Sequence, residues 1–313
     1  ARATIEKYLS AMSPARTTLS GYLEATYGFD TNVNSATSVG SIAIPVFGGA
    51  VGTFSGSSLS LRDSYIGGAG SVTLSHRFTD YVAFVGTLGG TAKWNRHQDT
   101  FDTAGYDASA GLRFTPDEAH AITLAAQAQS FRLDNTRFRD SSGVLAQWQW
   151  TRTPNSQLSV FGQWAMLGYP SQPSRDAYRT VGGIAYAHGF GGTWNPVGFA
   201  SVYGLHEKAD DPENFSYYSN NGGGLRLGGQ LNVLTKLQAF ATASHERRRY
   251  SADDPFFLVR RADRQTDYRV GLNYAFADRW SLIPSVAVTK NRSNFELYTY
   301  SRTLSSVALR RDF

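Results

Sequence analysis

The sequence predicts an all-β protein: a transmembrane antiparallel β-barrel of about 14 strands, with short periplasmic turns and longer extracellular loops. Three observations carry this prediction. From Thr17 onward, apolar and polar residues alternate with a period of two. The connections between the alternating segments are short and long in turn. Aromatic residues gather beside both kinds of connection, so the bacterial outer membrane is the expected location.

The alternating segments are separated well enough to be assigned one by one. The last of them is expected to pair with the first, because lipid cannot satisfy the open edge of a sheet. The expected strands cover 18–30, 58–78, 81–95, 103–114, 120–132, 142–153, 157–168, 176–190, 195–207, 220–232, 236–249, 264–276, 280–292 and 301–313.

The connections fall into two sets, and a soluble β-sandwich would not sort its loops in this way. The short set is expected in the periplasm and the long set outside the cell. The short connections lie within 77–82, 113–122, 151–158, 190–195, 232–237 and 276–281. The long ones are 31–57, 96–102, 133–141, 169–175, 208–219, 250–263 and 293–300.

Composition is compatible with this fold. The 313 residues carry a net charge of +5 and no Cys. The mean hydropathy is −0.32, which does not exclude a barrel because lipid-facing and lumen-facing residues average out. No zinc-finger spacing or long Lys/Arg block accompanies the basic pI, so no nucleic-acid partner is expected.

The N-terminal segment has a different period. Ile5, Tyr8, Leu9 and Met12 follow helical spacing, and Pro14 ends the pattern. We therefore expect a residual periplasmic helix or linker over 1–16, followed by the barrel over 17–313.

Alternation assigns the two faces of each strand. In the segment from Asp267, Tyr268, Val270 and Leu272 are expected to face lipid, whereas Asp267 and Arg269 are expected to face the lumen. The residues expected to line the lumen are Glu24, Arg77, Asp107, Arg113, Gln127, Gln147, Arg179, Arg226, Arg269, Arg302 and Arg310.

The first long loop contains apolar residues where a solvated loop should be polar. Ile42, Ile44, Val46 and Phe47 are expected either to pack against neighbouring loops or to fold into the lumen as a constriction. The second of these alternatives is the functional interpretation.

A second unusual segment spans 245–264 and is rich in arginine. It is either a salt-bridged surface or a site for an anionic partner, such as lipopolysaccharide phosphates or an anionic passenger. The arginines proposed for that anionic-partner surface are Arg247, Arg248, Arg249, Arg260 and Arg261.

No constellation suggests an enzyme. The histidines at 97, 120, 188, 206 and 245 are scattered and have no nucleophile motif or second metal ligand at a defined spacing. We therefore expect no catalytic residues, no metal and no cofactor.

Both ends of the barrel segment resemble a known family. YGFDTNVNSAT at 27–37, followed by IAIPVFGG, is similar to the start of the C-terminal barrel of surface lipoprotein assembly modifiers. SNFELYTYSRTLSSVALRRDF at 293–313 is similar to the end of that barrel. The final aromatic, Phe313, also resembles the signal by which the barrel assembly machinery recognises its substrates.

The resemblance implies a barrel that assists the translocation or surface display of lipoproteins or other proteins. It also implies a periplasmic tetratricopeptide-repeat domain before the barrel, which this sequence lacks, and it transfers no catalytic residues. Other readings of the same barrel are an anion-preferring diffusion or substrate-specific channel and a polysaccharide-export pore. The Arg-rich lumen motivates the channel reading.

Overall fold

The computed structural model describes residues 16–53 and 56–313. The helix expected over residues 5–12 lies outside the described residues. Among the described residues, no helix is both long enough and apolar enough to cross a membrane.

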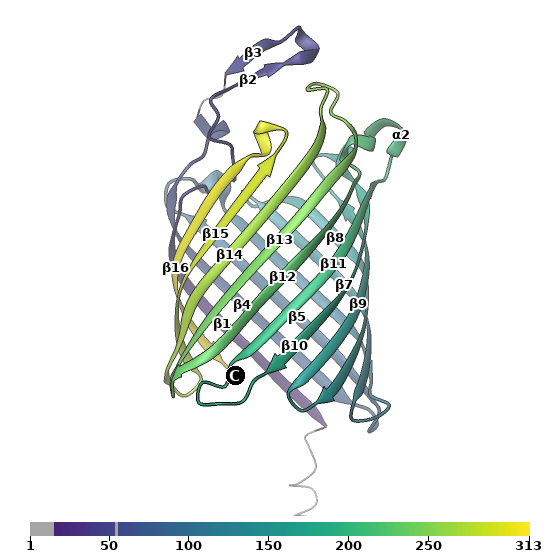
Figure 1. Cartoon of the computed structure of the whole chain (residues 1–313), viewed down its shortest axis with the longest axis vertical. Helices are drawn as coiled ribbons and strands as arrows, with labels where there is room; N and C mark the ends of the chain where they lie inside the picture. The colour runs from purple at the N-terminus through teal and green to yellow at the C-terminus, as the bar shows by residue number, and fades with distance from the viewer. Residues whose placement is uncertain (1–15, 54–55) are drawn as a thin grey trace, which may run out of the picture.

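Fourteen antiparallel strands close into one barrel, which confirms the predicted fold (Figure 1). Each strand pairs with its neighbours in sequence, and the first, β1, pairs with both β4 and the last, β16. The strands are β1 (Thr17–Asp30), β4 (Asp63–Arg77), β5 (Val82–Asn95), β6 (Thr103–Phe114), β7 (His120–Leu133), β8 (Thr136–Thr153), β9 (Ser156–Gly168), β10 (Ala177–Gly189), β11 (Val197–Ala209), β12 (Asn220–Leu234), β13 (Leu237–Asp253), β14 (Arg260–Ala277), β15 (Trp280–Ser293) and β16 (Tyr300–Asp312).

The closing seam between β1 and β16 is continuous. Nine residue pairs join the two strands, from Tyr22 with Asp312 to Asp30 with Leu304. Beyond them, Gly21 and Phe313 exchange two backbone hydrogen bonds of 2.9 Å. A Cβ atom on Gly21 would lie 2.7 Å from the Phe313 ring, so this glycine leaves room for the ring to cover the seam.

The outer wall is apolar, as the alternation predicts. On every barrel strand except β13, large hydrophobic side chains of the outward parity are exposed, and they form the surface that meets lipid. Exposed aromatic rings flank the turns at the periplasmic end, namely Phe78, Tyr81, Phe114, Phe190, Trp194, Phe276 and Phe313. Trp94, Trp164 and Tyr268 are exposed toward the other end.

One extracellular connection differs from its prediction. The long loop expected over 133–141 is a two-residue turn, Asp134–Asn135, because β7 and β8 continue beyond the expected strand ends. Both turn residues have positive φ, 49° and 59°, which Asp and Asn tolerate better than most residues and which matches the twist of a tight hairpin. The segment 250–263 is also mostly strand, with only 254–259 left as a loop.

The remaining extracellular loops carry short helical turns. In chain order these are η1 (Pro45–Phe47), η2 (Gly56–Ser58), η3 (Asp99–Phe101), η4 (Pro173–Arg175), α2 (Pro212–Phe215), η5 (Ser216–Tyr218) and η6 (Glu296–Tyr298).

The first loop forms a separate hairpin above the barrel (Figure 1). Its strands, β2 (Ser41–Ile44) and β3 (Ala50–Thr53), pair with each other. The loop therefore does not enter the lumen, and the constriction expected from Ile42, Ile44, Val46 and Phe47 is not formed. The reason is local: the hairpin satisfies its own backbone, and the Val46 N–H donates to the Phe256 carbonyl in the loop between β13 and β14.

Candidate functional site

The two ends of the barrel sequence meet in a buried ion cluster on the lumenal side of β1. Asp30 is 0% exposed and accepts three hydrogen bonds from the Arg302 guanidinium, at 2.6 to 3.1 Å. Lys93 of β5 donates to the same carboxylate at 2.5 Å, and its ammonium lies 4.8 Å from the centre of the Tyr65 ring. Two cations thus share one carboxylate at the extracellular end of the seam.

The residues after Asp30 anchor the first loop to this cluster. The buried Asn32 side chain donates to the carbonyls of Ala36 and Ser301, at 2.8 and 3.1 Å, and accepts from the Ala36 N–H. The Asn34 side chain accepts from the Leu61 N–H at 3.1 Å, and Leu61 lies in the segment by which the same loop returns to β4. The asparagines therefore satisfy backbone groups where the chain leaves the sheet, and they fix the base on which the β2–β3 hairpin stands.

The register places every residue expected to line the lumen on the face opposite the exposed hydrophobic side chains. Several of these residues are partnered there. Arg179 pairs with Glu207 at 2.6 Å, and Arg310 pairs with Asp312 at 2.7 Å while stacking on Tyr22. The predicted residues on this inward face are Glu24, Arg77, Asp107, Arg113, Gln127, Gln147, Arg179, Arg226, Arg269, Arg302 and Arg310.

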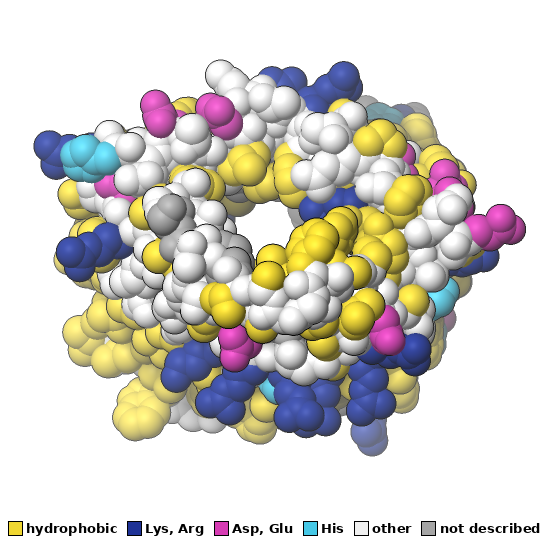
Figure 2. All heavy atoms as spheres, turned by 90° about the horizontal axis from the view of Figure 1, so that it is seen from above, with side chains coloured by type: hydrophobic (Ala, Val, Ile, Leu, Met, Phe, Trp, Pro, Cys, Tyr) yellow, Lys and Arg dark blue, Asp and Glu magenta, His cyan; other side chains and the backbone are white. Residues whose placement is uncertain are grey.

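The lumen consequently carries both signs of charge. Glu246 accepts from Tyr203 at 2.6 Å and from Arg248 at 2.7 Å, which adds another neutralised pair. Within the described part of the chain, no carboxylate lies within ion-pair distance of Arg226 or Arg269. Seen from above, the barrel has a central opening, and hydrophobic side chains border part of its edge (Figure 2).

The arginine-rich segment divides between the two faces, which corrects its interpretation as one surface. Arg248 points inward to Glu246, and Arg261 points inward to Asp263 at 2.6 Å. Arg260 pairs with Asp253 at 3.2 Å. Arg247 and Arg249 are exposed on the outer face. Alternation separates neighbours in sequence, so only part of the predicted set is available to an anion outside the barrel.

Sequence reasoning missed the partners of the ion cluster. Alternation along the first strand does not single out Asp30, and neither Lys93 nor Tyr65 belongs to a motif. The available signal was a charged residue of the inward parity near the extracellular end of each of two strands, Asp30 in β1 and Lys93 in β5. Their convergence depends on barrel closure, which brings Asp30 and Arg302 together across nearly the whole chain.

A second feature of the extracellular end is an apolar rim. We use this name for Val46, Phe47 and Val51 of the hairpin together with Phe256 and Leu258 of the adjacent loop. All five are exposed, with Phe47 at 65%, and the Val46–Phe256 hydrogen bond joins the two loops. Exposed apolar side chains gathered in this way mark contact surfaces more often than ordinary solvated loops do.

The described residues contain no group of three or more metal-ligating side chains. The buried carboxylates Asp30 and Asp63 are both occupied by nearby donors, Asp63 by the backbone N–H groups of His97 and Gln98.

Comparison with known proteins identifies the family. The sequence model described as "Surface lipoprotein assembly modifier" matches residues 20–313. The chain belongs to that family. No curated protein matches the chain. The family match covers both of the segments that meet at the ion cluster, and it assigns this outer-membrane barrel a role in lipoprotein assembly.

Solved structures support the fold of this surface lipoprotein assembly modifier. A FadL homologue of Pseudomonas aeruginosa has 11% sequence identity and a TM-score of 0.54, with 95% of this chain and 90% of that chain covered. The outer membrane channel DcaP of Acinetobacter baumannii has 8% identity and a TM-score of 0.55, with 95% and 97% covered. Both are outer-membrane barrels, and at this identity the similarity concerns the fold alone.

Proposed function

We propose that this barrel promotes the surface display of lipoproteins and that the apolar rim contacts the passenger as it reaches the outside of the cell. The rim is the observation that carries the proposal. A barrel whose only task was diffusion of small polar solutes would gain nothing from exposing Phe47, Val51 and Leu258 to water beside its mouth.

The anchoring of the rim supports the same role. The hairpin rests on hydrogen bonds of Asn32 and Asn34, and these are tied to the Asp30–Arg302 pair. A flexible loop would lose conformational entropy on binding, whereas a hairpin held at its base loses less. The rim is therefore held in place to receive an apolar segment of a passenger.

The test replaces exposed residues of the apolar rim and leaves the fourteen barrel strands unchanged. Phe47→Ser, Val51→Ser and Leu258→Ser are combined, and the surface level of a cognate lipoprotein is measured on intact cells by antibody labelling. We expect labelling to fall while the amount of folded barrel stays unchanged. A control in another extracellular loop combines Phe215→Ser and Tyr217→Ser, half-buried aromatic residues of the α2–η5 loop, and should leave labelling intact. Equal labelling in both variants would contradict the proposal.

An anion-preferring channel is the second candidate. Arg226 and Arg269 favour it, because the described lumen offers them no carboxylate. Under this reading, the rim variant would display lipoproteins normally, and loss of the barrel would slow the uptake of an anionic solute.

The proposed role requires partners. Insertion of the barrel would depend on the barrel assembly machinery, and delivery of passengers from the periplasm would depend on a repeat domain of the kind that the family resemblance implies. The passenger itself would be a lipoprotein. Neither an enzymatic step nor a cofactor enters this proposal.

A further inference from the structure

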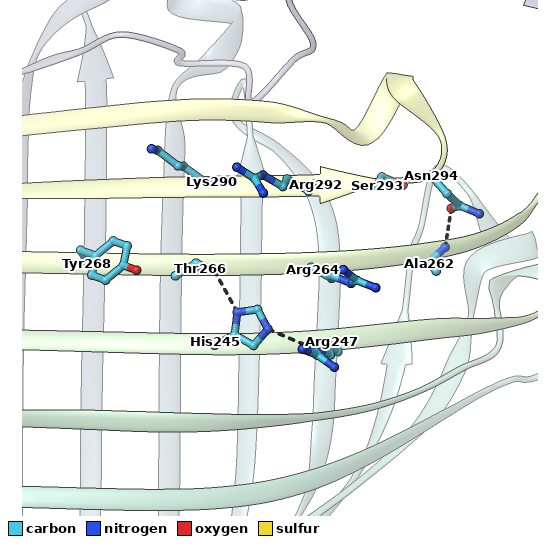
Figure 3. Close-up of a pocket in the computed structure, with 10 residues that line it drawn as sticks. All are labelled: His245, Arg247, Ala262, Arg264, Thr266, Tyr268, Lys290, Arg292, Ser293 and Asn294. Atoms are coloured by element: carbon cyan, nitrogen blue, oxygen red, sulfur yellow. Dashed lines mark hydrogen bonds between the residues drawn. The ribbon is translucent and has the colours of Figure 1, made fainter.

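The outer wall of β13, β14 and β15 carries a row of three arginines near its extracellular end. The register sets Arg247 directly opposite Arg264, and Arg264 directly opposite Arg292. All three side chains are exposed. Figure 3 shows them on neighbouring strands, and Figure 2 shows Lys and Arg gathered along the side of the barrel that these strands form. We call this set the arginine row.

Three like charges in register are unfavourable by themselves, because side chains directly opposite on neighbouring strands lie about 5 Å apart. Among the described residues, no carboxylate forms an ion pair with any member of the arginine row. The acids nearby, Glu246 and Asp263, point into the lumen and are occupied by Arg248 and Arg261. Alternation thus places the acids inside and leaves the outer cations uncompensated.

Toward the membrane, the side chains in successive rows become less charged and more apolar. His245, Thr266 and Lys290 form the row below the arginines, and Tyr268 lies between Ala243 and Val288 in the following one. Arg247 donates to His245 Nε2 at 3.2 Å, and the other ring nitrogen of His245 lies 2.9 Å from the Thr266 hydroxyl (Figure 3).

Below the tyrosine the wall is fully apolar, with Ala241, Val270 and Val286 in register. Successive rows lie about 7 Å apart along the strands. The order is therefore cationic, polar, aromatic and apolar, and Tyr268 marks the level of the membrane interface. The upper rows line a surface cavity of 660 Å³ with Ser293 and Asn294 at its extracellular end.

We propose that this surface binds the phosphorylated headgroup of an outer-leaflet glycolipid, with its phosphates on the arginine row and its acyl chains along the apolar rows below Tyr268. Guanidinium groups bind phosphate oxygens through paired, charge-assisted hydrogen bonds. The apolar rows select a lipid over a free anion. This site is outside the lumen and is independent of the passenger role.

The experiment measures how tightly the purified full barrel in detergent retains bisphosphorylated lipid A, by native mass spectrometry. Arg247→Gln, Arg264→Gln and Arg292→Gln are combined. We expect retention to weaken by about tenfold or more, as loss of several charge-assisted contacts implies. The control combines Arg96→Gln, Arg137→Gln and Lys208→Gln, which remove the same charge from exposed positions elsewhere at the extracellular end, and should retain lipid like the unmodified protein.

A second arm uses the unmodified protein, so it does not depend on the folding of any variant. Dephosphorylated lipid A should bind about tenfold more weakly than the bisphosphorylated form, and inorganic phosphate at millimolar concentration should not displace the lipid. Equal retention by the arginine-row variant and its control would overturn the proposal. So would equal binding of the two lipid forms, or complete displacement by free phosphate.

Discussion

At the residue scale, the structure contains a few buried carboxylates, of which one is entirely removed from water. Asp30 is the clearest, because two cations from different strands, Lys93 and Arg302, converge on it. Burying a charge is costly unless it is paired and hydrogen-bonded, and here each of the three charges needs the others. The cluster thus couples the seam, the base of the first loop and β5.

Replacing this carboxylate should destabilise the barrel. Asp30→Asn keeps the shape of the side chain but leaves the charges of Lys93 and Arg302 uncompensated. We expect the free energy of unfolding to fall by about 3–5 kcal/mol, the cost of removing one partner from a buried ion pair. Urea unfolding in lipid bilayers measures this change. Asp278→Asn, whose side chain is 97% exposed, is the control and should change stability little. Identical unfolding midpoints for the two variants would refute this account of Asp30.

At the scale of the elements, the seam between the first and last strands is the shortest pairing in the barrel, with nine residue pairs, and it is secured at both ends. Its periplasmic end is covered by Phe313, whose ring occupies the space that Gly21 leaves on the lipid face. Its extracellular end is held by the Asp30–Arg302 pair. A glycine that would otherwise expose backbone to lipid is thereby protected by an aromatic neighbour.

Removing the ring of Phe313 should impair assembly of the barrel. Phe313→Ala uncovers Gly21, so we expect less folded protein, whereas Phe313→Tyr keeps the ring and should fold normally. The measurement is the fraction of heat-modifiable barrel in the membrane. Phe276→Ala is a matched control, because Phe276 is 43% exposed and Phe313 is 42% exposed at the same end of the barrel. Equal losses in the two alanine variants would show that the seam contact has no special role.

Deleting the hairpin should leave the pore unchanged. The β2–β3 unit stands above the barrel, so removal of residues 38–53 takes nothing out of the lumen (Figure 1). We expect the single-channel conductance in a planar bilayer to match that of the complete barrel. A large increase would mean that the hairpin occludes the opening.

The same elements show what the sequence could predict. Period-two alternation settles which side of a strand each residue faces, so Arg179, Arg302 and Arg310 were placed on the lumenal parity without a structure. It cannot settle register between strands. The arginine row depends on three strands aligning Arg247, Arg264 and Arg292, and only pairing fixes that alignment.

Loop conformation was the least predictable part. Asp134–Asn135 resembled the centre of a long polar loop, but the turn chemistry of Asp and Asn allows the two strands to continue to it. The apolar residues of the first loop predicted either packing against a neighbouring loop or folding into the lumen. Ile42 and Ile44 pair within the β2–β3 hairpin, and the Val46 N–H donates to Phe256 of the neighbouring loop, while Phe47 stays exposed.

At the scale of the whole molecule, the barrel combines an apolar outer wall with a lumen in which many charges are paired. Arg179, Arg248 and Arg302 all have carboxylate partners, so the lumen is less cationic than its arginines suggest. Each such pair lowers the net positive field that the bore presents to a small ion, whereas Arg226 and Arg269 have no carboxylate within ion-pair distance among the described residues.

A measurement of ion selectivity tests whether the paired charges of the lumen cancel one another. The unmodified barrel should give a reversal potential near zero in a potassium chloride gradient. Glu246→Gln removes the partner of Arg248 and should shift the reversal potential toward chloride preference. Strong chloride preference in the unmodified barrel would favour the channel function instead.

The most direct test of the central claim is surface display in cells that lack this barrel. Lipoproteins exposed on intact cells are quantified by protease accessibility, with the gene deleted and then restored. The account predicts that deletion leaves at least one lipoprotein inaccessible to protease although its total amount is unchanged, and that the restored barrel returns it to the surface. If every surface lipoprotein remains accessible after deletion while uptake of an anionic solute slows, the barrel is a channel and the account is contradicted.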